Sequence, residues 1–230
     1  MSAAGLKRNL LKELDLFFGE RGFERRSDQF YGDRYDCVVQ GGRKSIAINA
    51  HFRKPALVLD PATASIRLDK VEEEVFRFEE KSALLSEHDA LQRNTIGLRL
   101  VGNEILNIAT NRYAITTEDD CVIVARRYAT EMLRKAERFW AEVPTEEAIL
   151  EKLSDVPGKA REYAGTDLFA AVRAIALAKL LHGEQAARDL ASRIMNRLSG
   201  TPKSELSIWV TRAFQAWDTA QDSAMNSVPQ

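Results

Sequence analysis

The spacing of apolar residues changes twice along this chain, and the order of those changes restricts the fold it can form. Over residues 6–18 leucines recur at helical spacing. From Phe23 to residue 68, and again over residues 94–101, short strand-like runs follow, while residues 69–80 contain helix formers without a clear apolar stripe and residues 82–92 suit a loop or a short helix. Helical spacing returns after Thr117 and continues to residue 219. Separate blocks of helix, strands and helices predict an α+β fold, in which an antiparallel sheet is packed by an N-terminal helix and a long later helix, with an all-helical C-terminal segment.

The stretch GERGFERRSDQFY, residues 19–31, combines glycines and arginines and raises the question of a phosphate-binding loop. Such loops run from a strand into a helix N-terminus, where free N–H groups point at the anion. Here the glycines follow a helix instead. We therefore predict that Gly19 and Gly22 end that helix and that Phe23 packs back onto its last turn.

Glycine and proline signals divide the middle of the chain into strand-like runs. We predict strands over residues 29–31, 35–40, 45–53 and 94–101, short edge strands over residues 56–59 and 65–68, and a hairpin turn at Gly41–Gly42. The acidic run Glu72–Glu74 is predicted to lie on a solvated surface.

Helix-capping signals mark the rest of the chain. Thr117 is the expected N-cap of a long helix reaching Trp140, since the acidic residues after it favour a first helical turn. Pro144 stops this helix, and Thr145 caps a short one through Leu153. Further helices are predicted over residues 167–182, 184–198 and 203–219. With Pro157–Gly158 as the boundary, we predict an α+β domain over residues 1–155, a helical cap over residues 156–222 and a flexible tail over residues 223–230.

Charge and cysteine content restrict the partners and the compartment. The formal net charge of −1 makes a nucleic-acid partner unlikely, although residues 1–54 are mildly basic.

Cys37 and Cys121 are predicted to be structural, reduced thiols in a cytoplasmic protein. The N-terminus lacks the apolar core of a signal peptide, and no apolar run approaches membrane-spanning length, so no membrane partner is expected. No cofactor and no metal site is predicted.

Residues 6–153 also carry a family resemblance. A basic N-terminal helix leads into GERGFERRSDQFY and antiparallel strands. The later stretch YAITTEDDCVIVARRYATEMLRKAERFWAEVPTEEAILEKL, Tyr113 to Leu153, places Thr-Glu-Asp-Asp before a long helix ending in Phe-Trp. This series resembles uncharacterised bacterial domains of the domain-of-unknown-function type, some of which look like immunity proteins of toxin systems. The resemblance implies the fold and carries over no catalytic residues.

Three functions remain open from the sequence. The first is a non-catalytic interaction protein, an immunity or regulatory factor that binds a protein partner. The second is a hydrolase or metal-dependent nuclease with dispersed catalytic residues, for which Asp60, Glu79 and Lys81 occur in a suitable order. The third is a nucleic-acid-associated protein that uses the basic first segment. The lack of a dense acid–base or metal constellation favours the first.

A candidate recognition surface follows from strand alternation. If residues 45–53 form one strand, its apolar side chains share one face and its polar side chains share the other. The predicted partner-binding residues on the polar face are Gln40, Asn49, His51, Arg53 and Arg99. Because antiparallel sheets commonly expose a polar face, an ordinary solvated surface is the alternative interpretation.

Overall fold

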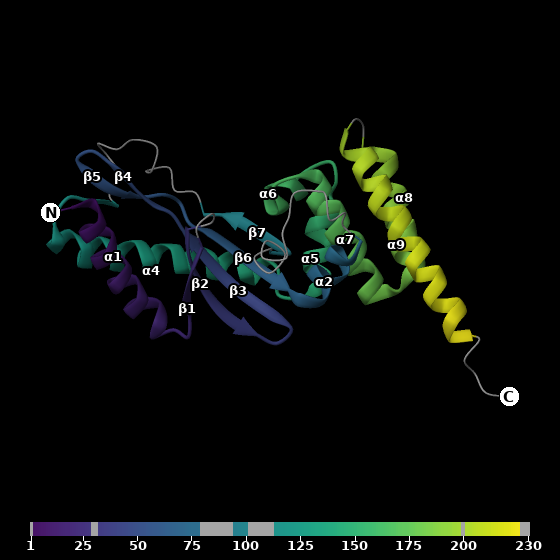
Figure 1. Cartoon of the computed structure of the whole chain (residues 1–230), viewed down its shortest axis with the longest axis horizontal. Helices are drawn as coiled ribbons and strands as arrows, with labels where there is room; N and C mark the ends of the chain where they lie inside the picture. Colours follow the sequence, from purple (N-terminus) through teal and green to yellow (C-terminus); the bar gives the residue numbers. More distant parts are fainter. Residues whose placement is uncertain (1, 29–31, 79–93, 101–112, 199–200, 226–230) are drawn as a thin grey trace. The chain divides into compact units, whose positions relative to one another are not determined.

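The structure is a computed structural model that describes residues 2–28, 32–78, 94–100, 113–198 and 201–225 (Figure 1). It contains helices and antiparallel strand pairs, which confirms the predicted α+β class. The chain divides into two compact units. Unit 1 comprises Met1–Ile66 and Gly97–Glu142, and unit 2 comprises Arg67–Ile96 and Val143–Gln230.

The bounds of these units differ from the predicted domains of residues 1–155 and 156–222. Pro157–Gly158, the predicted boundary, lies inside unit 2, and the chain enters unit 2 a first time at Arg67. The last helix reaches Met225, so residues 223–225 of the predicted tail are helical. Residues 226–230 lie outside the described part of the chain.

The described residues of unit 1 form two sheets and two helices. The five-stranded sheet has the order β1-β2-β3-β6-β7, and the three-stranded sheet has the order β4-β5-β8. The strands are β1 (Glu24–Asp28), β2 (Gly32–Val39), β3 (Gly42–Ile48), β4 (Ala50–Arg53), β5 (Ala56–Leu59), β6 (Thr63–Leu68), β7 (Ile96–Arg99) and β8 (Ala114–Ile115). The helices are α1 (Ala3–Gly19) and α4 (Glu118–Glu142), so the predicted N-terminal and long later helices are both present.

The core of unit 1 forms where α1 and α4 pack with the strands. The buried stripe of α1 repeats every four residues and consists of Leu6, Leu10, Leu14 and Phe18. The ring of Phe18 stacks on Tyr35 of β2 at 4.4 Å, and Phe23 stacks on Trp140 of α4 at 6.1 Å. The Trp140 indole donates to the backbone oxygen of Ser65 in β6, which ties the end of α4 to the five-stranded sheet.

The stretch at residues 19–28 is the helix-to-strand corner that the sequence predicts. The Phe23 N–H donates to the Phe18 carbonyl and the Gly22 N–H to the Gly19 carbonyl, the paired bonds of a Schellman motif. Gly22 has a φ of 78°, a left-handed conformation that glycine adopts without strain. Arg25 then bridges two carboxylates, Asp15 at 2.8 Å and Asp33 at 3.2 Å. The charge of Arg25 is therefore paired with carboxylates of the same fold.

Several strand predictions are corrected by the structure. Residues 45–53 do not form one strand: β3 ends at Ile48, and β4 begins at Ala50 in the other sheet. The hairpin register pairs Val39 with Gly42, so the turn is Gln40–Gly41 rather than Gly41–Gly42. The predicted edge strands β5 and β6 are both interior strands of their sheets. The predicted strand at residues 29–31 lies outside the described residues, and β1 precedes it.

A capping box starts α4, as the Thr117 signal predicts. The Thr117 hydroxyl accepts from the Asp120 N–H at 3.2 Å, while the Asp120 carboxylate accepts from the Thr117 N–H at 2.8 Å. The same carboxylate accepts from the N–H and hydroxyl of Thr116. Those bonds hold the pKa of Asp120 down at about 2, because they favour its charged form.

Unit 2 packs one short helix, α2 (Asp69–Arg77), with the C-terminal helices. These are α5 (Glu146–Ser154), α6 (Ala160–Ala164), α7 (Asp167–His182), α8 (Glu184–Arg197) and α9 (Thr201–Met225). The middle of α7 is buried on all sides, which its alanines permit by allowing close helix approach. Trp209 of α9 donates to the Val75 carbonyl at 3.1 Å, and Trp217 donates to Glu74 at 2.8 Å. Both tryptophans are therefore core anchors.

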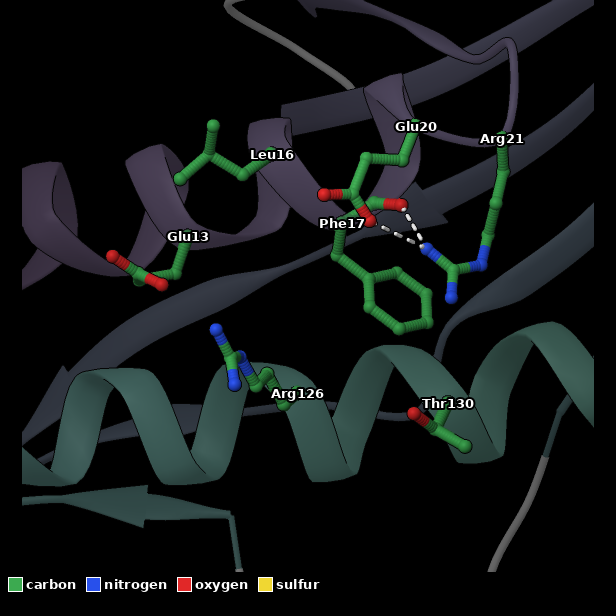
Figure 2. Close-up of a pocket in the computed structure, with 7 residues that line it drawn as sticks. All are labelled: Glu13, Leu16, Phe17, Glu20, Arg21, Arg126 and Thr130. Carbon is green, nitrogen blue, oxygen red and sulfur yellow. Dashed lines mark hydrogen bonds and ion pairs between the residues drawn. The ribbon is translucent and has the colours of Figure 1, made fainter.

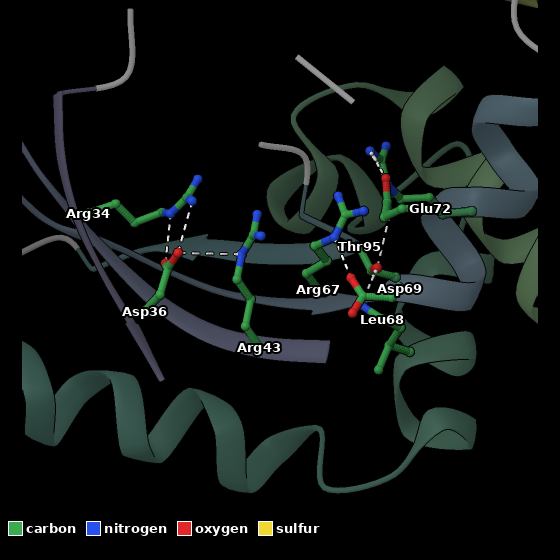
Figure 3. Close-up of polar contacts among 9 residues, drawn as sticks. Arg34, Asp36, Arg43, Arg67, Leu68, Asp69, Glu72 and Thr95 are labelled. Carbon is green, nitrogen blue, oxygen red and sulfur yellow. Dashed lines mark hydrogen bonds and ion pairs between the residues drawn. The ribbon is translucent and has the colours of Figure 1, made fainter. Parts of the chain in front are cut away.

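The prediction of a solvated Glu72–Glu74 run is wrong for two of its three residues. Glu72 and Glu74 are buried, and only Glu73 is exposed. Glu72 pairs with Arg173 and accepts from the Thr95 hydroxyl at 2.9 Å (Figure 3). Glu74 pairs with Lys179 of α7 and with Arg77. Buried carboxylates are tolerated here because each has a cationic partner.

No helix within the described ranges combines the length and the apolar character needed to cross a bilayer.

Candidate partner-binding surface

The predicted recognition residues do not gather on one sheet face. Gln40 lies in the β2–β3 turn, Arg53 ends β4 of the three-stranded sheet, and Arg99 lies on β7 at an edge of the five-stranded sheet. Only Asn49 and His51 meet, both on one carboxylate oxygen of Asp60. The predicted grouping is wrong because the chain leaves the first sheet at Asn49. A role for any of these residues in binding stays a prediction.

The five-stranded sheet does carry a polar face, with different members. Arg34 donates to both carboxylate oxygens of Asp36, at 2.7 and 2.9 Å, and Arg43 Nε lies 3.8 Å from the same group (Figure 3). In the β2–β3 register these side chains lie on the face opposite Tyr35 and Ile46. Arg34 and Asp36 are buried, so this cluster is not an open docking surface.

The two cysteines differ in burial: Cys37 is half-buried, and Cys121 is buried. Cys37 and Cys121 are both free thiols. Burial, followed by the nearby charges of Asp120 and Glu118, raises the pKa of the Cys121 thiol above its ordinary value. Cys121 is almost completely buried, which confirms the packed-cysteine interpretation for this residue, and a raised pKa favours the protonated thiol. The nuclease alternative stays a prediction, because Glu79 and Lys81 lie outside the described residues.

A surface groove of about 410 Å³ lies between α1 and α4 (Figure 2). The lining side chains come from α1 and its C-terminal turn on one side and from α4 on the other: Glu13, Leu16, Phe17, Glu20, Arg21, Arg126 and Thr130. The groove combines two carboxylates, two guanidinium groups and apolar side chains. We call this region, extended by Val122 and Ile123 one helical turn before Arg126, the α1–α4 face.

One end of the groove is fixed by Arg21. Its guanidinium donates to the Phe17 carbonyl at 2.6 Å and lies 3.8 Å from the centre of the Phe17 ring (Figure 2). A cation at a helix C-terminus is stabilised by the helix dipole, and its position over an aromatic ring adds a cation–π contact. Arg21 therefore holds Phe17 in place at this end of the groove.

Exposed apolar side chains accompany the groove on both helices. Leu16 of α1 is 56% exposed and Ile123 of α4 is 60% exposed, with Val122 less so. Leu16 lies off the buried stripe of α1, which continues from Leu14 to Phe18. Sequence reasoning missed this surface, although two signals were present: a leucine out of phase with its stripe, and arginines on the outward side of the long helix.

The chain has an α+β fold with a groove between α1 and α4 of unit 1. In comparisons with protein-family models, curated proteins and solved structures, no match to this chain was found. The resemblance to immunity-type domains stays a prediction. Within the described ranges, no three His, Cys, Asp or Glu side chains are grouped as metal ligands would be.

Proposed function

We propose that this protein is a non-catalytic interaction protein, an immunity or regulatory factor, that binds a protein partner through the α1–α4 face. The observation that carries the proposal is the exposure of Leu16 and Ile123 beside a groove. Single exposed apolar residues are ordinary on protein surfaces. Their grouping with Phe17 and Val122 around a concave surface rimmed by charges is typical of a protein-binding site.

The groove also suits a helical segment of the partner. Two helices in contact leave a furrow into which an amphipathic helix can place side chains spaced three and four residues apart. Burial of Leu16 and Ile123 by such a segment would remove apolar area from water, at about 25 cal/mol per Å². The rim charges, Glu13 and Glu20 on one side and Arg126 on the other, would then set the orientation of the segment.

Affinity capture tests the proposal. The wild-type chain, the variant Leu16→Glu/Ile123→Glu and the control Ile208→Glu are immobilised and exposed to a soluble extract of the source organism. Ile208 on α9 is exposed to a similar degree, so the control introduces the same kind of change in unit 2. We expect proteins that the wild type and the control retain and that the α1–α4 variant loses.

The retained partner is then purified, and its affinity for the three chains is measured by calorimetry. An immunity role further requires that the partner be toxic when expressed alone and harmless when co-expressed with this chain. If all three chains retain the same proteins with the same affinity, the α1–α4 face is not the binding surface and the proposal fails.

A further inference from the structure

The outward side of α4 carries four exposed arginines, which we call the arginine face: Arg126, Arg127, Arg134 and Arg138. At 3.6 residues per turn these positions fall within roughly a third of the helix circumference. Among the described residues, no carboxylate lies within 4.0 Å of their guanidinium nitrogens. These side chains are exposed, and their positive charges are not neutralised by a neighbouring carboxylate of the described residues.

The carboxylates of α4 do not neutralise this face. Glu131 accepts from the Tyr113 hydroxyl at 2.6 Å and pairs with Lys135, and Asp120 caps the helix. Glu137 is the exposed carboxylate between Ile123 and Arg138, so the arginines outnumber it four to one there. Like charges on neighbouring turns repel one another, and a stretch of this kind is stabilised by binding an acidic surface.

We propose that the arginine face and the adjoining Leu16 and Ile123 recognise an acidic amphipathic helix of the partner protein. The inference rests on the proposed function and specifies the chemistry of its ligand. Carboxylates of the partner helix pair with the guanidinium groups, and its apolar side chains cover Leu16 and Ile123. Arginine suits this task because its planar fork of donors matches a carboxylate.

The surface favours a protein ligand over a nucleic acid or a lipid membrane. Glu13 and Glu20 line the groove beside Arg126 (Figure 2), so an anionic ligand must place its negative charges over the arginine face and away from these two carboxylates, which a uniformly charged phosphate backbone or anionic membrane surface does not do. Contact with phosphate groups would not remove the exposed apolar side chains from water. A helix with carboxylates along one edge and leucines along its centre is complementary to both features.

Two synthetic helical peptides test the inference. They share the same leucine positions, and one carries glutamate where the other carries lysine. Binding of each labelled peptide to the full chain is measured by fluorescence anisotropy at low and high salt. We expect the glutamate peptide to bind and the lysine peptide to bind at least about tenfold more weakly, with a preference that declines as salt screens the charges.

Matched charge reversals locate the contact. Arg134→Glu/Arg138→Glu changes the arginine face, and Arg193→Glu/Arg197→Glu makes the same change at two exposed positions with the same spacing on α8. The first variant should weaken binding of the glutamate peptide about tenfold or more, and the second should leave it unchanged. Circular dichroism confirms that both variants remain folded.

Three results would overturn the inference: no binding of the glutamate peptide, equal binding of the lysine peptide, or tighter arginine-face-dependent binding of a DNA duplex or anionic vesicle. These results are separable from failure of the proposed function. Suppose that the wild type retains a protein, that Leu16→Glu/Ile123→Glu loses it, and that the arginine reversals do not change its binding. The α1–α4 face would then still be the docking surface, and only the inferred preference for an acidic helix would be wrong.

Discussion

Glu72 of α2 and Arg173 of α7 form a bidentate ion pair inside unit 2, although 101 positions separate them in the sequence. Arg173 Nε lies 2.9 Å from Glu72 Oε1, and Nη2 lies 3.0 Å from Oε2. Both side chains are buried, and Thr95 adds a hydroxyl donor to the same carboxylate. A carboxylate held this way positions α2 on α7, because any displacement leaves a charge buried without its partner.

The first prediction follows from this pair. Arg173→Met should lower the free energy of unfolding by about 3–5 kcal/mol, since it leaves the Glu72 carboxylate buried without a cation. Denaturant unfolding measures the loss. As a control, Arg26→Met removes an exposed ion pair with Glu24 and should change stability by about 1 kcal/mol or less. Glu72→Leu/Arg173→Met should recover much of the loss, and a double variant as unstable as Arg173→Met alone would contradict this account.

The second prediction compares two leucines on α1. Leu14 is fully buried in unit 1, whereas Leu16 is 56% exposed. Leu14→Ala should cost about 2–5 kcal/mol, because it removes core contacts and leaves a cavity. Leu16→Ala should change stability by about 0.5 kcal/mol or less. Thermal and denaturant melts of the two variants provide the measurement, and a comparable loss at Leu16 would show that this side chain is packed rather than available to a partner.

The third prediction concerns acid stability. The capping bonds lower the pKa of Asp120 from 3.8 to about 2 in the folded state, so they stabilise the fold fully above the unfolded pKa. That contribution is lost as the pH falls from about 4 towards 2, because protonation removes the charged acceptor. Asp120→Ala should cost about 1 kcal/mol at neutral pH, a typical value for an exposed cap.

Unfolding of the wild type and of Asp120→Ala at pH 6 and pH 3 measures this dependence. The difference between the two proteins should be smaller at pH 3. A difference that stays constant or grows on acidification would show that the carboxylate charge does not stabilise the cap. Asp119→Ala, which also removes an exposed carboxylate from the first turn of α4, is the matched control for general charge effects.

The fourth prediction concerns the thiols. Cys121 is buried, and burial raises the pKa of its thiol, so it should react with a thiol reagent far more slowly than an accessible cysteine. The variants Cys37→Ser and Cys121→Ser isolate each thiol in turn. We expect Cys121 to react at an appreciable rate only in denaturant and Cys37 to react in native buffer. If both thiols reacted at the same rate in native buffer, Cys121 would not lie in a packed environment.

Local signals in the sequence predicted much of the helical structure. The predicted helix over residues 167–182 coincides with α7, and Thr117 and Thr145 cap the helices expected of them. Such signals suffice because a cap satisfies N–H groups within three residues of itself. The corner at Gly22 was predictable for the same reason, since its hydrogen bonds join residues no more than five positions apart.

Pairings across the chain were not available from local pattern. Alternation continues through residues 45–53, yet the chain changes sheets at Asn49, where Asp60 accepts from the Asn49 side chain at 2.8 Å. The acidic run at Glu72 resembles a solvated surface until α7 supplies Arg173 and Lys179. Whether a charge is solvated or buried depends on a partner that the local sequence does not reveal.

The candidate surface was likewise predictable only in part from the local sequence. The sequence alone determined that α1 and α4 are amphipathic, and with them the side on which Leu16 and the arginines lie, because helical geometry fixes the direction of each side chain. The folded structure adds what the local pattern does not contain: α1 and α4 pack together and leave a groove, and Arg53 and Arg99 fall on different sheets. Contacts between elements depend on which buried faces match in shape and charge, and that matching involves residues far apart in the chain.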